Sequence, residues 1–305
     1  MYLLICLPQN ILSSTLQQEQ KHTKSQPTEI PISSAPRHFN LQLRVSRFFF
    51  RPCDGQGTYR VSLKAFLKAG QHISFSEART LEFVASHTSI PVPKVLKMWR
   101  HPRSGVPFIL MEFVRGEELT FVWNRMSQKE KERVVDQLKG YMRQLRNLEP
   151  PTHLAGRVCA VDGGPLVDMS RIDVYPTFGP FPTHSDFHRF LRVGLSFDRL
   201  EEENKPGYDK IIYTHTHSYA SKFSHADFAP RNILVKRDGT ITVIVDWAYA
   251  GWYPEYWEYT RARYSPFLPH SWIPRIGEMT GQYDQELAGE MALWRDFSSL
   301  TQGNG

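Results

Sequence analysis

The segment that most constrains the fold is residues 225–247, which read HADFAPRNILVKRDGTITVIVDW. Two β-branched apolar runs flank the pair Asp238 and Gly239, and Asp-Gly is a strong signal for a tight turn between antiparallel strands. A hairpin with this turn brings Asn232, at the entry of the first strand, beside Asp246, at the exit of the second. An amide oxygen and a carboxylate suit Mg²⁺, which takes one or two protein oxygens and completes its shell with water and phosphate. The segment therefore predicts a metal site formed by Asn232 and Asp246.

Asp227 lies just upstream of the hairpin, where Pro230 interrupts the regular backbone. A carboxylate there can face the metal site without binding the metal, and it can accept the proton of a hydroxyl group. The spacing from Asp227 to Asn232 matches the phosphoryl-transfer template of kinases. The alternative is a hairpin whose Asn and Asp satisfy backbone amides, with His225 as a buried core histidine. The full pattern, HxDxxxxN followed by strand, turn, strand and Asp, favours phosphoryl transfer.

The same template requires a cation for the phosphates, which a lysine in the first lobe supplies and a glutamate on a helix positions. Lys68 ends a predicted strand in AFLKAG, and Glu77 begins the helix predicted after it. Each also has a simpler interpretation, as a surface lysine and a helix-capping glutamate, which the downstream motif makes less favoured. A glycine loop over the phosphates is poorly defined, because GQGTYRV supplies only Gly55 and Gly57. An ordinary hairpin turn is the favoured interpretation there.

The chain divides into a tail and two predicted lobes. Residues 1–38 predict a disordered tail, since most of this stretch is rich in Gln, Ser, Thr and Pro. Residues 39–114 predict a mainly β lobe and residues 115–305 a mainly α lobe, which is an α+β chain with a cleft at the junction. The predicted strands cover residues 39–51, 58–70 and 105–114, and the predicted helices cover residues 74–87, 127–149, 185–195, 253–264 and 285–300.

Composition is that of a globular protein, with 41% hydrophobic and 22% charged residues among 305. The net charge of +6 suits an anionic partner, but the basic residues are scattered, so nucleic-acid binding is not favoured. Cys6, Cys53 and Cys159 lie far apart without a CxxC pair, which indicates a reducing compartment and no zinc site. The opening MYLLICLP is a poor signal peptide, and no later segment has the length of a membrane span. We expect a cytoplasmic monomer that acts on a small molecule and not at a membrane.

The motifs above lie within longer stretches, which read FLKAG, FILMEFVRGEEL, FSHADFAPRNILV and ITVIVDWAYAGWYPEYWEYTRA. Together these stretches resemble the aminoglycoside phosphotransferase family of protein-kinase-like enzymes, especially its fungal members. The resemblance implies a bilobal kinase-like fold, ATP and Mg²⁺ between the lobes, and transfer of the γ-phosphoryl group to a hydroxyl of a small molecule. It places the adenine near residues 111–114, so Glu112 and Val114 are expected at the cofactor.

The same resemblance implies a role for each candidate residue. Lys68 is expected to bind the ATP phosphates, and Glu77 is expected to orient that lysine. Asp227 corresponds to the catalytic Asp, and Asn232 and Asp246 correspond to the metal ligands.

Two positions depart from the family pattern. Ala226 stands where the family usually has Gly, which is tolerable unless the position requires a positive φ. Ala248 stands where relatives often have Glu, so one acidic group near the metal site is absent. The departures leave a kinase-like binding protein with little activity as an alternative. A protein kinase is less favoured, because the short distance from Asp246 to the next predicted helix leaves no room for a long activation segment.

The sequence does not define the acceptor. An acidic pocket would suit a polycationic aminoglycoside, and the scattered candidates for one are Glu255, Glu258, Asp284 and Glu286. Two histidine pairs have simple interpretations. His215 and His217 are expected in a loop, and His184 and His188 on a solvated helix face.

Overall fold

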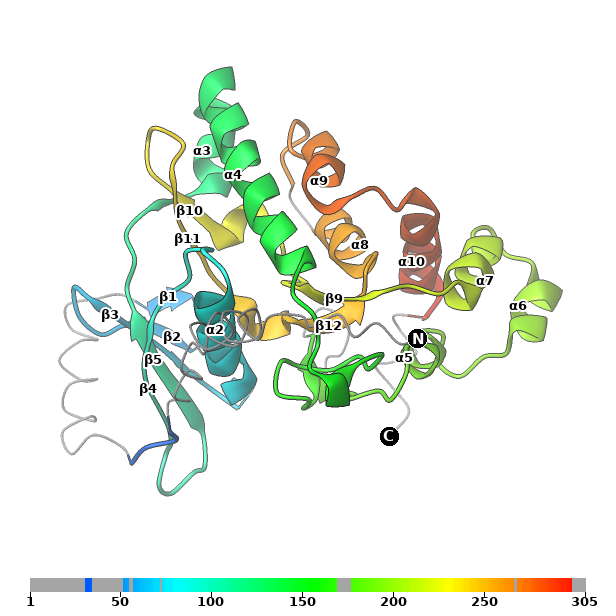
Figure 1. The fold of residues 1–305 in the computed structure, drawn as a ribbon, viewed down its shortest axis with the longest axis horizontal. Coiled ribbons are helices and arrows are strands. Elements are labelled where there is room, and N and C mark those ends of the chain that lie inside the picture. The colour runs from blue at the N-terminus through cyan, green and yellow to red at the C-terminus, as the bar shows by residue number, and fades with distance from the viewer. Residues whose placement is uncertain are drawn as a thin grey trace, which may run out of the picture.

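The computed structural model describes residues 31–34, 52–54, 57–71, 73–168, 177–265 and 268–297. Most of the predicted tail, residues 1–38, and the whole strand predicted over residues 39–51 lie outside these residues. Within them the chain forms a sheet lobe, at the left of Figure 1, and a helical lobe at the right, which is the expected α+β arrangement. None of the helices in the described ranges is long and apolar enough to cross a membrane.

The first lobe is an antiparallel sheet with the strand order β1-β2-β3-β5-β4. Its strands are β1 (Pro52–Asp54), β2 (Thr58–Arg60), β3 (Ala65–Ala69), β4 (Val95–Arg100) and β5 (Pro107–Glu112). The strand predicted over residues 58–70 is two strands, because the main-chain N–H groups of Val61 and Ser62 both donate to Ala65 across a turn. β3 lies between β2 and β5, and there Lys68 pairs with Thr58 on one side and Ile109 on the other.

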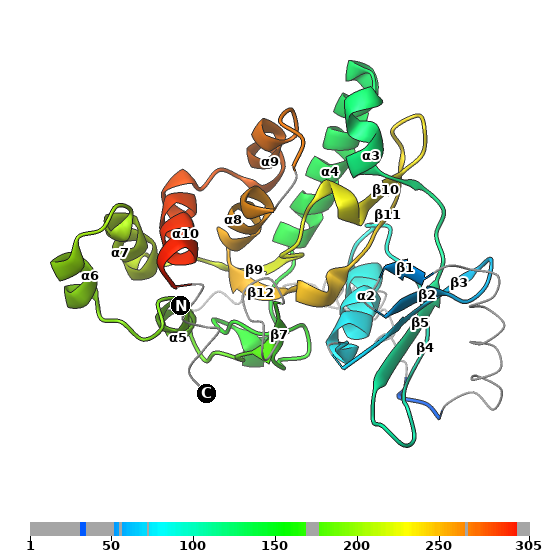
Figure 2. The same cartoon turned by 180° about the vertical axis from the view of Figure 1, so that it is seen from behind.

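Helix α2 (Phe75–His87) follows β3 and lies between the sheet and the second lobe (Figure 2). The side chain of Ser74 caps its first turn by accepting a hydrogen bond from the backbone N–H of Ser76. One face of the helix is buried and joins the core with residues of β4 and β5; these are Ala78, Leu81, Val84, Met98 and Ile109. The helix predicted over residues 74–87 is confirmed, and its apolar spacing explains why it packs on the sheet.

The second lobe is mainly helical. Its helices are α3 (Leu119–Val122), α4 (Gln128–Arg146), α5 (His184–Leu191), α6 (Phe197–Glu203), α7 (Tyr208–Thr216), α8 (Trp257–Tyr264), α9 (Ile273–Thr280) and α10 (Asp284–Phe297). The long α4 begins with the capping box formed by Ser127 and Glu130. Two short strands, β7 (Leu166–Val167) and β8 (Thr177–Phe178), pair beside α5. The loop expected around His215 is wrong: this residue lies on the buried face of α7, where its polarity and that of Thr214 obscured the helical pattern.

The predicted hairpin around Asp238 and Gly239 is confirmed as β10 (Ile233–Val235) and β11 (Ile241–Ile244). The chain that links the lobes forms β6 (Glu117–Glu118), which pairs with β10 on the side away from β11. The side chain of Gln137, on α4, donates to the main-chain oxygen of Gly239 at 2.9 Å and so fixes the turn. The hairpin is therefore held by the interlobe link on one side and by α4 at its tip.

Candidate active site

The segment from Ser221 to Pro254 joins two pairs of strands. β9 (Ser221–Ser224) pairs with β12 (Gly251–Pro254), and the loop after β9 leads through the 3₁₀ turn Pro230–Asn232 into the hairpin. The register pairs Ile233 with Ile244, and the N–H of Val245 donates to the main-chain oxygen of Asn232 at 2.9 Å. The structure thus places Asn232 and Asp246 at the same end of the hairpin, next to the loop that carries Asp227.

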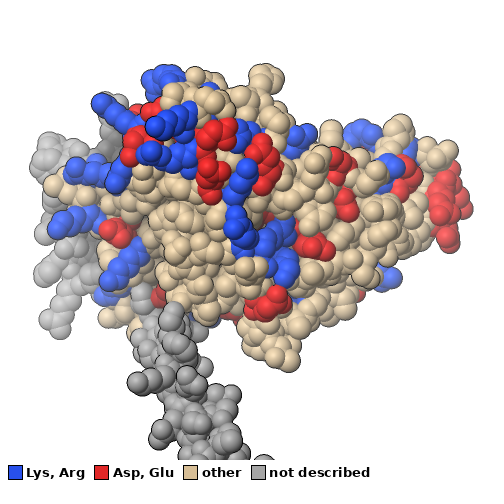
Figure 3. All heavy atoms as spheres, turned by 45° about the horizontal axis from the view of Figure 1, so that its top comes forward, with Lys and Arg blue, Asp and Glu red and all other residues tan. Residues whose placement is uncertain are grey.

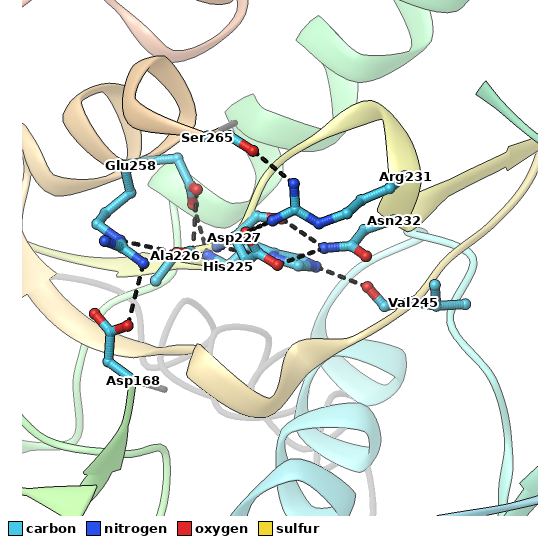
Figure 4. A network of polar contacts seen from close by, with 10 residues as sticks. Asp168, His225, Ala226, Asp227, Arg231, Asn232, Val245, Glu258 and Ser265 are labelled. Atoms are coloured by element: carbon cyan, nitrogen blue, oxygen red, sulfur yellow. Dashed lines mark hydrogen bonds and ion pairs between the residues drawn. The ribbon is translucent and has the colours of Figure 1, made fainter. Parts of the chain in front are cut away.

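Both carboxylate oxygens of Asp227 accept hydrogen bonds from the residues of the 3₁₀ turn (Figure 4). The amide nitrogen Nδ2 of Asn232 donates to Oδ2 at 2.8 Å and to the main-chain oxygen of Asp227 at 2.8 Å. The guanidinium nitrogen Nη2 of Arg231 donates to Oδ1 at 2.5 Å, and its Nη1 donates to Ser265 Oγ at 2.6 Å. The Asp227 side chain is 14% exposed and that of Arg231 is 40% exposed. The loop carboxylate is therefore fixed in direction but remains reachable from the Arg231 side.

Lys68 links the two lobes. Its Nζ donates to Glu77 Oε1 at 2.6 Å and to Asp246 Oδ1 at 2.7 Å, so residues of β3, α2 and the end of the hairpin meet at one atom. Burial alone would lower the pKa of Lys68, but the two carboxylates raise it above its usual value. Burial raises the pKa of Glu77. At Asp246 burial acts in the same direction, but the charge and the hydrogen bond of Lys68, together with other nearby positive groups, lower its pKa overall. Lys68 is therefore a fixed cation at the junction of the lobes.

His225 supports the backbone of the segment. Its Nδ1 accepts a hydrogen bond from the N–H of Asp227 at 3.2 Å, so Nε2 carries the proton and donates to the main-chain oxygen of Val245 at 3.0 Å. The ring is fully buried, packs 4.5 Å from the Trp247 ring, and has a pKa lowered by burial. His225 is therefore a neutral buried histidine that ties the Asp227 loop to the strand before Asp246, and the core interpretation fits it.

Glu258, on α8, holds the start of the same loop. Its Oε2 accepts from the N–H of His225 at 2.6 Å, and its Oε1 accepts from the N–H of Ala226 at 3.2 Å. Burial raises the pKa of Glu258 to about 7, against the effect of the two backbone hydrogen bonds. The sequence suggested Glu258 as part of an acidic acceptor pocket, but the side chain has no exposed surface.

The other acids suggested for an acceptor pocket also have protein partners. Glu286 is buried and accepts from the hydroxyl of Tyr219, and Asp284 accepts from Tyr259. A carboxylate oxygen of Glu255 accepts from the N–H of Ala220 at 3.3 Å. These contacts occupy the side chains that the sequence offered as a binding surface for a polycation.

Ala226 has a left-handed backbone, with φ of 61°. This is the conformation in which glycine is free of strain and alanine costs roughly 1–2 kcal/mol. The main-chain oxygen of Ala226 accepts a weak hydrogen bond from Nε of Arg261 at 3.4 Å, and Arg261 pairs with Asp168 at 3.3 Å. The departure from Gly at this position is therefore a real strain, and contacts on both sides of the peptide hold it in place.

The two residues expected at the adenine lie where the first lobe joins the second. Glu112 ends β5, its N–H donates to the main-chain oxygen of Lys94 at 2.8 Å, and its side chain is exposed. Val114 follows two residues later and is half-buried, just before β6. The structure thus places both between the sheet of the first lobe and β6, which pairs with the hairpin, while an adenine contact stays a prediction.

β1 and β2, which flank the GQG stretch, pair antiparallel with Asp54 opposite Thr58, and this agrees with the simpler interpretation of a hairpin. Residues 55 and 56 lie outside the described residues. The main-chain oxygen of Gly57 accepts from the N–H of Ala69 at 2.9 Å, and a Cβ at Gly57, whose φ is 85°, would lie 2.1 Å from the oxygen of Ala69. The turn is therefore packed against the strand that carries Lys68, and only glycine fits there.

The oxygen atoms that Asn232 and Asp246 offer suit Mg²⁺ better than a metal that needs all its ligands from the protein. Among the residues that the structure describes, no group of three His, Cys, Asp or Glu side chains could hold a metal ion. The Asp246 side chain is 46% exposed and uses Oδ1 for Lys68, which leaves Oδ2 for a ligand. Because Asn232 uses Nδ2 for Asp227, its Oδ1 points away from that carboxylate (Figure 4). One carboxylate and one amide oxygen match a Mg²⁺ that keeps water and phosphate ligands.

The solvated helix face expected for His184 and His188 is wrong for His188. This side chain is 1% exposed, its Nε2 lies 2.9 Å from the hydroxyl of Tyr256, and its ring stacks on that of His215 at 4.3 Å. Burial lowers the pKa of His188 to about 3, so the ring is neutral. The stacked rings of His188 and His215 therefore lie in the buried interior of the helical lobe.

Comparisons with known proteins agree with this fold. A family model described as "Phosphotransferase enzyme family" matches residues 46–294. One similar structure is a thermostable mutant of aminoglycoside phosphotransferase APH(4)-Ia in a ternary complex with AMP-PNP and hygromycin B, at 16% identity and a TM-score of 0.54, covering 87% of this chain and 88% of that chain. Another is the GDP and kanamycin complex of an APH(2″) enzyme, at 16% identity and a TM-score of 0.54, covering 84% and 87%.

A third similar structure is the gentamicin complex of APH(2″)-IIa, at 14% identity and a TM-score of 0.53, covering 87% of this chain and 88% of that chain. At such low identity these structures show a shared fold. No curated protein sequence matches the chain.

Proposed function

Because the chain belongs to the phosphotransferase enzyme family, we propose that it transfers the γ-phosphoryl group of ATP, with Mg²⁺, to a hydroxyl group of a small molecule. One observation carries this proposal. Lys68 binds Glu77 and Asp246, and Asn232 binds Asp227, at the same end of the hairpin. The similar solved structures include complexes with AMP-PNP and GDP, which supports a nucleotide site in this fold.

Lys68 and Glu77 would form the phosphate side of the site. The raised pKa of Lys68 keeps its ammonium group charged, and the hydrogen bond to Glu77 directs it toward the hairpin. The close packing of Gly57 on Ala69 brings the β1–β2 turn against the same strand. A fixed cation at this strand end is what the phosphates of a bound nucleotide require. In this arrangement Glu112 and Val114 would line the adenine end of the cleft.

Asn232 and Asp246 would hold Mg²⁺ through their free oxygens. The ion would supply positive charge that stabilises the phosphoryl group during transfer. The protein prepares for it with the hydrogen bond from Asn232 to Asp227, which fixes the amide orientation, and with the Lys68 contact, which fixes that of Asp246.

Asp227 would orient the acceptor hydroxyl and receive its proton. The hydroxyl oxygen forms a bond to the γ-phosphorus while the bond from that phosphorus to the β–γ bridging oxygen breaks, and ADP leaves. Asp227 is suited to this role because its carboxylate is directed by two residues yet partly exposed.

A small acceptor is favoured over a protein substrate by the chain that follows Asp246. The next helix, α8, begins at Trp257, and the intervening residues form a 3₁₀ turn, Trp247–Tyr249, and β12. Since β12 pairs with β9 along its whole length, this stretch has no free loop that could serve as an activation segment.

Nucleotide titration by thermal shift tests the proposal. ATP with Mg²⁺ should raise the melting temperature of the wild type, and Lys68→Ala should abolish most of that rise. Asp246→Ala should remove the part that depends on Mg²⁺, while Asp227→Ala should retain nucleotide binding and lose phosphoryl transfer. Asp209→Ala, whose side chain is 70% exposed on α7, is the matched control. A wild type that responds to neither ATP nor GTP, with or without Mg²⁺, would disprove the proposed function.

A further inference from the structure

Arg231 lies directly on the carboxylate proposed as the catalytic base. Its guanidinium spans Asp227 Oδ1 at 2.5 Å and Ser265 Oγ at 2.6 Å, between the loop and the end of α8 (Figure 4). The side chain is 40% exposed, whereas that of Asp227 is 14% exposed. Arg231 therefore lies against Oδ1 of Asp227 and is the more exposed partner of the pair.

A hydroxyl group that is to donate its proton to Asp227 approaches a carboxylate whose two oxygens each already accept a side-chain hydrogen bond, so one of those side chains has to leave room for it. Oδ2 is held by Asn232 Nδ2 at 2.8 Å, within a short turn that also gives Asn232 its main-chain contact to Asp227. Oδ1 is held by the longer and more exposed side chain of Arg231. The Arg231 contact is the one that an incoming molecule can displace.

The chemistry of the guanidinium indicates what displaces it. A planar guanidinium exchanges one carboxylate for another oxyanion readily, because carboxylate and phosphate oxygens fit the same pair of N–H groups. An ammonium group offers Arg231 no acceptor and is repelled by it. An acceptor that carries a carboxylate or phosphate beside its hydroxyl would draw Arg231 away and expose Oδ1 in the same step.

The other carboxylates of this network do not offer a site for a cationic acceptor. Asp168 is 3% exposed and paired with Arg261 at 3.3 Å, and Glu258 is fully buried against backbone N–H groups. On the face shown in Figure 3, acidic and basic side chains are interspersed, so no single sign of charge covers that surface. With Asp246 assigned to the metal, the exposed charge next to Asp227 is that of Arg231, which favours an anionic molecule over a cationic one.

We propose, on the basis of the function proposed above, that Arg231 is the specificity residue of the acceptor site. It covers Asp227 until an acceptor binds whose oxyanionic group, a carboxylate or a phosphate, lies next to the reactive hydroxyl. The same contact restrains the transfer of the phosphoryl group to water when no acceptor is present.

A matched series of three-carbon probes tests the acceptor class by thermal shift on the protein with ADP and Mg²⁺. The probes are glycerol, D-glycerate, glycerol 3-phosphate and 3-amino-1,2-propanediol at equal ionic strength. Glycerate or glycerol 3-phosphate should raise the melting temperature, and which of them does so distinguishes carboxylate from phosphate. Arg231→Gln should lose this response, and the control Arg237→Gln, on a residue that is 97% exposed at the hairpin tip, should keep it.

Hydrolysis of ATP without an acceptor tests the covering of Asp227. Arg231→Gln should raise this rate about fivefold, the factor that corresponds to loss of a partly exposed ion pair. Arg231→Lys keeps the charge but lacks the planar guanidinium. It should hydrolyse ATP as slowly as the wild type but lose the melting-temperature response to the probes. Slow hydrolysis in this variant would also show that loss of the probe response does not require misfolding.

Three results would overturn the inference: an unchanged hydrolysis rate in Arg231→Gln, an equal probe response in Arg231→Gln and the wild type, or a response to the amino probe or to none of the four. Failure of the proposed function is a separate result, because there the wild type would not respond to ADP, ATP or Mg²⁺ at all.

Discussion

Replacement of Glu258 by Gln separates two opposing effects on one buried carboxyl group. Burial favours the neutral acid, whereas the N–H groups of His225 and Ala226, at 2.6 and 3.2 Å, favour the carboxylate. Burial prevails and raises the pKa of Glu258 to about 7. Gln has nearly the same size and retains one oxygen acceptor, but it has no proton to lose. The variant therefore removes the titration while it leaves most of the packing in place.

The sign and size of the effect follow from the pKa. In the unfolded chain the group titrates near 4.5, and in the folded protein near 7. Because the folded pKa is raised, this group's contribution to stability is fully present below pH 4.5 and is lost as the pH rises through 7. An interval from 4.5 to about 7 corresponds to about 3 kcal/mol. The unfolding free energy of the wild type, relative to that of Glu258→Gln, should fall by about this amount between pH 4.5 and 8.

Urea unfolding followed by tryptophan fluorescence at four pH values from 4.5 to 8 measures this difference. Glu201→Gln, on the exposed surface of α6, is the control, and its difference from the wild type should not vary with pH. A difference between Glu258→Gln and the wild type that is constant within about 0.5 kcal/mol would refute the reasoning. A change of opposite sign would show that the two backbone N–H groups outweigh burial and that the carboxyl group is ionised throughout.

Two further predictions concern the backbone of the segment and the interlobe ion pair. Ala226→Gly should change the unfolding free energy by less than about 1 kcal/mol, because relief of the left-handed strain is offset by the lost methyl contact and the greater freedom of the unfolded chain. Ala226→Val should lower it by more than about 2 kcal/mol. Denaturant unfolding of the two variants checks this, and equal stability would contradict it. Lys68→Met should destabilise the protein by about 3 kcal/mol, since it leaves the Glu77 carboxylate buried beside Asp246 without a cation. The double variant with Glu77→Gln should recover part of this loss. Calorimetry of both variants measures the difference, and no recovery would show that the buried charge is not the cause.

The hairpin and the capped helices could be predicted because their signals are local. Asp238 and Gly239 specify the turn by their own backbone preferences, and the β-branched apolar runs on each side specify the strands. The capping box of Ser127 and Glu130 likewise lies within four residues of chain. The placement of Asn232 beside Asp246 follows from the hairpin alone, which is why the metal-ligand pair could be proposed from sequence.

The supports of the site could not be predicted, because each depends on a contact between distant segments. Glu258 reaches the Asp227 loop from 32 and 33 residues away, and it lies on a helix that is buried on nearly all sides, so the spacing of apolar residues does not single it out. The orientation of Arg231 toward Asp227 depends on the 3₁₀ turn that follows Pro230. His188 and His215 are polar residues on buried helix faces, so the spacing of apolar residues gives no sign of them. The positive φ of Ala226 was the one such feature with a sequence signal, the Gly usual in the family at this place.

The two strained residues of the segment show how these distant supports act together. Ala226 and Asp246 both have left-handed backbones, with φ of 61° and 63°, where the chain leaves β9 and β11. Each such residue costs roughly 1–2 kcal/mol and persists only where other contacts determine the conformation. At Ala226 those contacts are the carboxylate of Glu258 on its N–H and the guanidinium of Arg261 on its oxygen; at Asp246 the main one is Lys68. Since Glu258 and Arg261 lie in the helical lobe and Lys68 in the sheet lobe, the geometry of the segment from Ala226 to Asp246 depends on both lobes being folded and in contact.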